Sequence, residues 1–122
     1  MRLKDKVAII TGAGLGMGRE ASLLFASQGA SVGVFDMNAA AGNETVQLIE
    51  KAGGKAVFIQ GDVSKEADVK DGIEETVKTF GKVNILYANA GVLWKDRDKS
   101  VIETSEENWD LVQAINLKGT FF

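Results

Sequence analysis

Residues 11–18 read Thr-Gly-Ala-Gly-Leu-Gly-Met-Gly, and this stretch decides which fold the chain can adopt. It follows a short apolar run at residues 7–10, which is typical of a buried strand, and it precedes a segment with helical periodicity. Glycines between a strand and a helix permit a tight turn and let the backbone approach a pyrophosphate, which the free N–H groups of the helix N-terminus stabilise. The stretch therefore predicts a phosphate-binding turn between a strand and a helix.

The glycine spacing in this turn is Gly12-x-x-x-Gly16-x-Gly18, and Gly14 adds a further glycine. The spacing departs from the pattern G-x-G-x-x-G, because Met17 stands where the last glycine would be when counted from Gly12. A glycine-rich turn without a ligand is the alternative interpretation. The position of the turn directly after a buried strand favours a phosphate ligand over that alternative.

Three further apolar runs follow, separated by segments with helical periodicity. The predicted strands cover residues 7–10, 31–35, 56–59 and 83–88. All four have the composition of strands that are buried on both faces of a sheet. Alternation of strands and helices predicts right-handed crossovers and a parallel sheet wound on both faces, so the fold class is α/β.

Capping residues mark the ends of the predicted helices. Glycines stand at three expected C-terminal ends: Gly29, Gly53-Gly54 and Gly81. Ser64 stands where the third helix needs an N-cap. Thr104, followed three residues later by Glu107, has the spacing of a capping box and predicts a fourth helix that starts near residue 105. We expect one domain over residues 1–122, which ends within or just after this helix.

Composition excludes several classes of chemistry. The chain of 122 residues contains no Cys, His or Pro, so disulfides, thiolate or imidazole metal sites, and steps relayed by cysteine or histidine are excluded. The formal net charge of -3 provides no basic surface for nucleic acid. No apolar stretch has the length of a signal peptide core or a membrane span. We expect a cytoplasmic protein without a nucleic-acid or membrane partner.

Asp36 ends the second predicted strand, close to the interval of about 20 residues that separates such a turn from the acid that binds an adenosine ribose. Its carboxylate can accept hydrogen bonds from both ribose hydroxyls, and it repels a 2′-phosphate. Leu15 and Met37 supply no nearby cation to offset that repulsion. The sequence therefore favours NAD over NADP, with a solvated aspartate at a strand end as the alternative interpretation.

Polar and small residues also follow the third and fourth predicted strands, at the sheet edge where ligands of open α/β folds bind. Asp62, next to Val63, can accept a hydrogen bond from the adenine amino group or can be an ordinary turn acid. The segment Asn89-Ala90-Gly91 leaves room for a ligand. The amide of Asn89 can also bond the backbone of a neighbouring strand, and both roles stay open.

Asn116 lies on the predicted fourth helix, on the same face as Trp109 and Val112. A buried amide on an apolar face needs hydrogen-bond partners, which a local packing network or a functional site can provide. The residues alone favour the packing network.

Together these motifs resemble the N-terminal half of a short-chain dehydrogenase/reductase, and the resemblance covers essentially the whole chain. It implies a Rossmann fold with strand order 3-2-1-4, which strands 5, 6 and 7 complete in a whole family member. It implies that NAD is bound by residues of the turn and the strand ends: Gly12, Gly14, Leu15, Gly16, Met17, Gly18, Asp36, Met37, Asp62, Val63, Asn89, Ala90 and Gly91. Asn116 matches the catalytic-helix asparagine of the family, which supports a proton-relay water.

The resemblance also implies hydride transfer between a nicotinamide and a small alcohol or carbonyl substrate, with Ser, Tyr and Lys as the family's catalytic residues. These three residues have no counterpart in the chain. The single tyrosine, Tyr87, lies on the fourth predicted strand and is followed four residues later by Gly91 instead of lysine. We therefore expect the 122-residue chain to supply the cofactor site without catalysing the reaction alone.

Two other functions compete with this interpretation. One is a nucleotide-binding module without catalysis, and the other is an S-adenosylmethionine-dependent methyltransferase, which also uses a glycine turn and acids after its second and third strands. Thr11 stands where such methyltransferases commonly have a carboxylate, and Asn89-Ala90-Gly91 is the wrong signature for them, so the dehydrogenase is favoured. We also expect a homo-oligomer, because an unpaired sheet edge and exposed apolar surface promote self-association.

Overall fold

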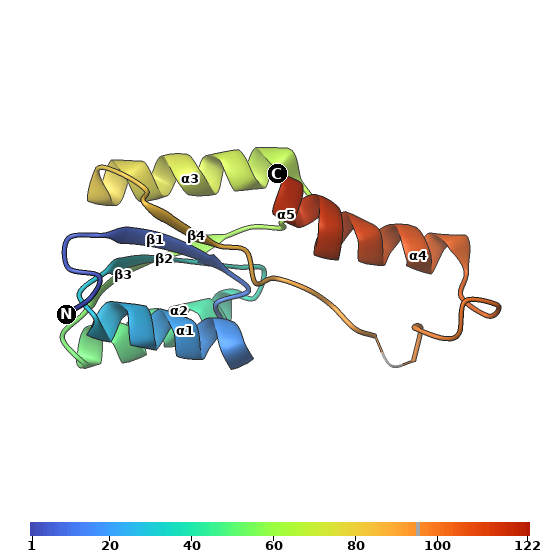
Figure 1. Cartoon of the computed structure of the whole chain (residues 1–122), viewed down its shortest axis with the longest axis horizontal. Coiled ribbons are helices and arrows are strands. Elements are labelled where there is room, and N and C mark those ends of the chain that lie inside the picture. Colours follow the sequence, from blue (N-terminus) through green and yellow to red (C-terminus); the bar gives the residue numbers. More distant parts are fainter. Residues whose placement is uncertain (95) are drawn as a thin grey trace.

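The computed structural model describes residues 1–94 and 96–122. Strands and helices alternate along the chain as far as the fourth strand (Figure 1). The elements are β1 (Val7–Thr11), α1 (Gly16–Ser27), β2 (Ser31–Asp36), α2 (Ala39–Lys51), β3 (Lys55–Gln60), α3 (Glu66–Phe80), β4 (Ile85–Tyr87), α4 (Glu106–Gln113), the π-helix η1 (Ala114–Lys118) and α5 (Gly119–Phe121). In these residues no helix is both long enough and apolar enough to cross a bilayer.

The four strands form one parallel sheet in the order β3-β2-β1-β4. This finding confirms the α/β class and the strand order expected from the sequence. In the register of the sheet, Ile9 of β1 lies between Gly33 of β2 and Leu86 of β4. The strand order reverses between β1 and β4, and ligands of open α/β sheets bind at such a switch point, outside the carboxyl ends of the strands.

Helices cover both faces of the sheet. Figure 1 shows α1 and α2 on one side of the sheet and α3 on the other. Successive side chains of β1 enter opposite layers, since Ile10 belongs to a core cluster with Ile49 of α2, whereas Ile9 belongs to a second cluster with Ile59 and Val63. Burial of one such side chain stabilises the fold by about 1.5–3 kcal/mol, so these two clusters hold the central strands in place.

The strands at the two edges of the sheet are less buried than the sequence predicts. β1 and β2 are buried along nearly their whole length, but residues 56–58 of β3 are only half-buried and Leu86 of β4 is exposed. The prediction of four strands buried on both faces is therefore wrong for β3 and β4. The predicted fourth strand is also too long, because only residues 85–87 pair with β1.

Glycines with positive φ follow the first three helices. Gly29, Gly53 and Gly81 have φ angles of 94°, 87° and 86°. A left-handed residue ends a helix by turning its N–H back to the last carbonyl groups, and glycine adopts this conformation without a Cβ clash. The predicted C-terminal ends are therefore confirmed.

The predicted N-caps need correction. Lys65, not Ser64, is the N-cap of α3, and it makes no side-chain capping bond, while the hydroxyl of Ser64 donates to Asp62. Ser105, not Thr104, caps α4, and its hydroxyl accepts a hydrogen bond from a backbone N–H of the first turn. In each case a neighbouring residue has the extended backbone that an N-cap requires.

The last helical segment runs from α4 through η1 to α5 and projects beyond the end of the sheet (Figure 1). Its end returns towards α3, where Phe122 lines a small apolar pocket together with Val69 and Gly72. Leu117 and Phe121 are exposed on this segment. The fourth helix thus begins within one residue of its predicted start, and it carries Asn116 back to the carboxyl edge of the sheet.

Candidate functional site

The glycine turn joins the carboxyl end of β1 to the N-terminus of α1. Gly12 and Gly16 have φ angles of 65° and 54°, which glycine adopts with little strain. A side chain at Gly18 would overlap the carbonyl oxygen of Gly12 and lie 2.7 Å from the amide nitrogen of Asn89. The N-cap residue Leu15 makes no side-chain hydrogen bond to the first turn of α1. The N–H groups of that turn are thus left for a ligand, and they favour an anion.

Asn89 ties the end of β4 to the end of β1. The backbone N–H groups of Asn89 and Ala90 both donate to the hydroxyl of Thr11, each at 3.0 Å. The side-chain Nδ2 of Asn89 donates to the carbonyl oxygens of Thr11 and Gly12, at 3.1 Å and 3.4 Å. The strand-bonding role that the sequence left open for Asn89 is therefore present, and it holds the glycine turn against the fourth strand.

The carboxylate of Asp36 lies at the end of β2 beside the glycine turn. Its Oδ2 accepts a hydrogen bond from the backbone N–H of Gly14, and its Oδ1 accepts one from the backbone N–H of Asn38, both at 2.8 Å. Each carboxylate oxygen can accept a second hydrogen bond. Two acceptor positions therefore suit the two hydroxyls of a ribose. Leu15 and Met37 are exposed and bring no positive charge to the site.

The contacts of Asp62 are those of a turn acid. Its Oδ1 accepts hydrogen bonds from the backbone N–H and the hydroxyl of Ser64, at 2.9 Å and 2.7 Å. Its own N–H donates to Asp68 at 2.9 Å. Val63 is buried against Phe35 in the core cluster beside α3. The turn role that the sequence left open for Asp62 is present, and an adenine contact stays a prediction.

A pocket of about 170 Å³ is lined by residues at or just after the carboxyl ends of all four strands. Its lining includes six predicted binding residues: Gly12, Asp36, Met37, Val63, Ala90 and Gly91. Asp62 lines a neighbouring shallow pocket with Met37 and Lys65. Residues far apart in the sequence, such as Thr11 and Ala90, which are 79 positions apart, are therefore assembled at one edge of the sheet.

Asn116 lies in the middle of η1 and reaches the segment that follows Gly91. Its Oδ1 accepts a hydrogen bond from the N–H of Val92 at 2.8 Å, and its Nδ2 donates to the carbonyl oxygen of Val92 at 3.0 Å. The residue is exposed, so the prediction of a buried amide on an apolar face is wrong. The amide still has both partners, because the π-helical turn places it beside a loop. Such turns occur frequently at functional sites.

Tyr87 lies outside the candidate site. Its ring stacks on that of Phe25 in α1, with a centroid separation of 6.3 Å, and packs against the core cluster that contains Ile10. A tyrosine in this position cannot exchange a proton with a ligand at the carboxyl edge of the sheet.

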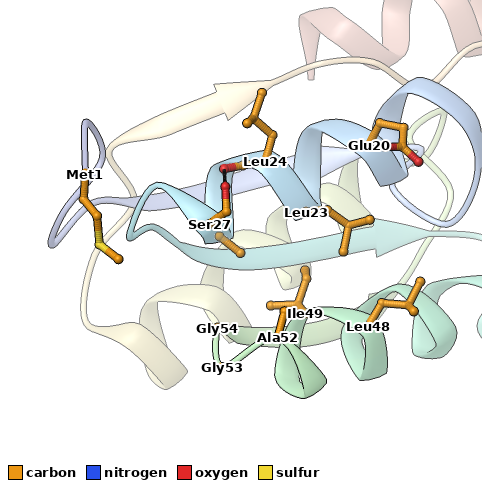
Figure 2. Close-up of a pocket in the computed structure, with 11 residues that line it drawn as sticks. Met1, Glu20, Leu23, Leu24, Ser27, Leu48, Ile49, Ala52, Gly53 and Gly54 are labelled. Atoms are coloured by element: carbon orange, nitrogen blue, oxygen red, sulfur yellow. Dashed lines mark hydrogen bonds between the residues drawn. The ribbon is translucent and has the colours of Figure 1, made fainter.

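A larger groove, of about 630 Å³, lies between α1 and α2. Figure 2 shows Leu23, Leu24, Leu48 and Ile49 along this groove, with Met1 at one end. Its described lining includes none of the predicted binding residues and is mostly apolar. We place the functional site at the smaller pocket, because the glycine turn, the carboxylate and the uncapped helix converge there.

From the sequence we did not identify Arg19 and Thr45, whose side chains donate hydrogen bonds to backbone carbonyl groups of the glycine turn. Arg19 donates to the carbonyl oxygen of Gly14, and the hydroxyl of Thr45 donates to that of Ala13. The position of Arg19 in the first turn of a predicted helix was a signal that the sequence offered. A cation near a helix N-terminus opposes the helix dipole, so it needs a compensating partner. Thr45 carries no such signal, because its partner is 32 residues away.

A parallel β3-β2-β1-β4 sheet with a glycine turn at its switch point places the chain in the class of Rossmann-type α/β domains. Comparison with known families then identifies the particular one. The model described as short chain dehydrogenase matches residues 6–122, so the chain belongs to the short-chain dehydrogenase/reductase family. The match confirms the resemblance found in the sequence and favours it over a methyltransferase.

Individual relatives agree with this assignment. An uncharacterized oxidoreductase of Thermotoga maritima is 45% identical over 121 residues, which make up 99% of this chain and 46% of that protein. A cyclohexanol dehydrogenase of an Acinetobacter species is 39% identical over 121 residues, or 99% of this chain and 47% of that protein. The crystal structure of a short chain dehydrogenase from Mycobacterium avium matches with a TM-score of 0.93 at 37% identity and covers 99% of this chain and 44% of that one. The chain spans less than half the length of each.

Proposed function

We propose that residues 1–122 form the NAD(H)-binding part of an oxidoreductase that transfers hydride between a nicotinamide and a small alcohol or carbonyl substrate. The observation that carries this proposal is the pocket at which the glycine turn, Asp36 and Ala90-Gly91 meet. Family membership supports the class of reaction. A dinucleotide has a pyrophosphate, an adenosine ribose and an adenine, and the chain offers a separate feature for each.

The donor chemistry of the residues at this edge supports a dinucleotide, with free N–H groups at the start of α1 and carboxylate acceptors on Asp36. A Cβ at Gly12 would lie 2.9 Å from the Cα of Ala90, so the turn is packed as closely as glycine allows. We assign the pyrophosphate to the N–H groups at the start of α1, the adenosine ribose to Asp36, and adenine to Asp62 and Val63. The nicotinamide end would then lie beside Asn89, Ala90 and Gly91. When bound, the nicotinamide ring supplies the hydride acceptor or donor.

We propose a supporting catalytic role for Asn116. Its amide holds both backbone groups of Val92 and so orients the segment that follows Gly91, on the border of the cofactor pocket. The family resemblance adds that the residue supports a water in proton transfer. We do not assign the proton donor to Tyr87, because its side chain packs against the core cluster that contains Ile10 and does not line the pocket.

The charge of Asp36 is the basis for a preference for NADH over NADPH. A 2′-phosphate about 5 Å from a carboxylate is repelled by roughly 3 kcal/mol per unit charge in an effective dielectric of about 20. The exposed side chains of Leu15 and Met37 offer no compensating cation. We therefore expect the protein to bind NADH more tightly than NADPH.

Fluorescence titration of the purified protein with NADH and NADPH tests this proposal. Asp36→Ala and the isosteric Asp36→Asn should both narrow the affinity gap, because both remove the charge that repels a 2′-phosphate. Asp71→Ala is the matched control, since it removes the same charge from an exposed position on α3 and should leave the gap unchanged. Equal affinities of the unaltered protein for the two dinucleotides would sink the proposed preference. Binding of neither would sink the proposed function.

A further inference from the structure

The side chain of Arg19 donates hydrogen bonds to acceptors in both the glycine turn and α2. Its Nε donates to the carbonyl oxygen of Gly14 at 2.8 Å and to Oγ1 of Thr45 at 3.1 Å. Its Nη2 donates to the carbonyl oxygen of Ala41 and to the carboxylate of Glu44, both at 3.2 Å. The side chain is only 17% exposed. A planar guanidinium held by this many acceptors has one well-defined position.

Gly14 lies between this guanidinium and the carboxylate of Asp36. Its carbonyl oxygen accepts from Arg19, while its N–H donates to Oδ2 of Asp36 at 2.8 Å. The packing is tight, because a Cβ at Gly14 would lie 2.9 Å from that Oδ2 and 3.0 Å from the Cβ of Ala41. A shift of Gly14 would therefore change the hydrogen bond that orients the carboxylate.

The other side of Arg19 is braced by α2. Thr45 is fully buried, and its hydroxyl accepts the hydrogen bond from Arg19 and donates to the carbonyl oxygen of Ala13 at 2.9 Å. The acceptors of Nη2, Ala41 and Glu44, also belong to α2. Arg19 thus links the glycine turn to α2.

We propose that Arg19 is a positioning residue for cofactor selectivity: it fixes Gly14, and through Gly14 it holds the Asp36 carboxylate where it accepts a ribose and repels a 2′-phosphate. This inference rests on the proposed dinucleotide function. Arg19 contacts the backbone of the turn and α2, so its effect on the nucleotide passes through Asp36.

The direction in which the ratio of the NADPH Kd to the NADH Kd changes when Arg19 is replaced distinguishes the positioning role from two simpler roles, phosphate attraction and stability alone. Loss of a positioning residue weakens NADH binding more than NADPH binding, so the ratio of the NADPH Kd to the NADH Kd falls. Loss of a cation that merely attracts phosphate weakens NADPH more, because NADPH carries the additional phosphate, and the ratio rises. Loss of a residue needed only for stability leaves the ratio unchanged.

The experiment measures both dissociation constants for Arg19→Met, Asp36→Ala, the double variant and the control Arg2→Met in the purified protein at its full natural length. Arg2→Met removes the same charge from an exposed residue before β1. We expect Arg19→Met to lower the ratio about tenfold, the scale of a charge-assisted hydrogen bond, and Arg2→Met to leave it unchanged. In the Asp36→Ala background, Arg19→Met should change the ratio by less than about twofold, since the carboxylate it positions is gone.

Thermal unfolding without ligand shows whether each variant folds. If Arg19→Met does not fold, Arg19→Lys takes its place, because lysine keeps the charge but lacks the planar fork that bridges Gly14 and α2. An unchanged or increased ratio in either variant overturns the positioning role while the proposed function stands. Full additivity with Asp36→Ala also overturns it. Binding of neither dinucleotide by the unaltered protein overturns the proposed function and this inference together.

Discussion

At the residue scale, the candidate site depends on glycines, which have no side chain, as much as on residues whose side chains make contacts. Gly18 has a φ that any residue could adopt, but a Cβ there would overlap the carbonyl oxygen of Gly12. Gly53 is the reverse case, since its φ is 87° and its Cβ would meet no atom within 4 Å. Substitution of Gly18 therefore tests the effect of close packing, and substitution of Gly53 tests the effect of backbone strain.

Gly18→Ala should lower the free energy of unfolding by about 3 kcal/mol, because the overlap forces the turn to move. It should also weaken NADH binding, since the displaced backbone forms the site proposed for the pyrophosphate. Gly53→Ala should cost about 1 kcal/mol through backbone strain and leave NADH binding unchanged. Urea unfolding and fluorescence titration measure the two effects. An NADH affinity of Gly18→Ala equal to that of the unaltered protein would contradict the proposed site.

At the element scale, helix ends decide how the site is positioned. α1 begins without a side-chain cap and so leaves its first N–H groups to a ligand, whereas α2 is capped by Asn38 and α4 by Ser105. The contrast has a physical reason, because a capping side chain would occupy the same N–H groups that an anion needs. α3 also lacks a side-chain cap, but Glu66 and Asp68 lie in its first turn, whereas the first turn of α1 holds no acid. The combination of an uncapped end and an adjacent glycine turn therefore marks the candidate site, and the capped ends of α2 and α4 contribute to stability.

Ser105→Ala should lower the free energy of unfolding by about 1 kcal/mol, the usual contribution of an N-cap serine. Thr104→Ala should cost less, because the hydroxyl of Thr104 donates to the exposed carbonyl oxygens of Lys99 and Ser100 and not to α4. Urea denaturation of both variants measures the difference. A larger loss for Thr104→Ala would show that Thr104, as the sequence predicts, caps the helix.

At the scale of the whole molecule, the sheet has two different edges. β3 ends the sheet on one side, and β4 on the other presents Leu86 with 61% of its surface exposed. Leu117 and Phe121, at the end of the last helical segment, are exposed as well. The homo-oligomer expected from the sequence stays a prediction.

A polypeptide of residues 1–122 should bind NADH without oxidising a secondary alcohol in the presence of NAD⁺. The physical reason is that the single tyrosine stacks on Phe25 against the core cluster that contains Ile10 and does not line the proposed cofactor pocket, so its phenol is not placed to exchange a proton there. Absorbance at the NADH band measures turnover, and NADH binding by the same sample serves as the control for folding. Measurable turnover by a chain of verified mass would contradict the prediction.

The sequence alone determined the α/β class, the glycine turn and the position of Asp36 at a strand end, because these features depend on local periodicity and spacing. The strand order was expected only from the resemblance to the family. It misplaced two N-caps and overestimated the burial of β3 and β4, since capping depends on backbone angles and burial depends on which strands lie at the edges. The tertiary structure decided the rest. It brought the hydroxyl of Thr11 within hydrogen-bonding distance of the N–H groups of Asn89 and Ala90. It also formed the hydrogen bond between Asn116 and Val92. Gly14 is hydrogen-bonded to both Arg19 and Asp36. Apart from the contact between Arg19 and Gly14, which are five positions apart, these hydrogen bonds join residues at least 22 positions apart, and the packing of the elements brings them within hydrogen-bonding distance.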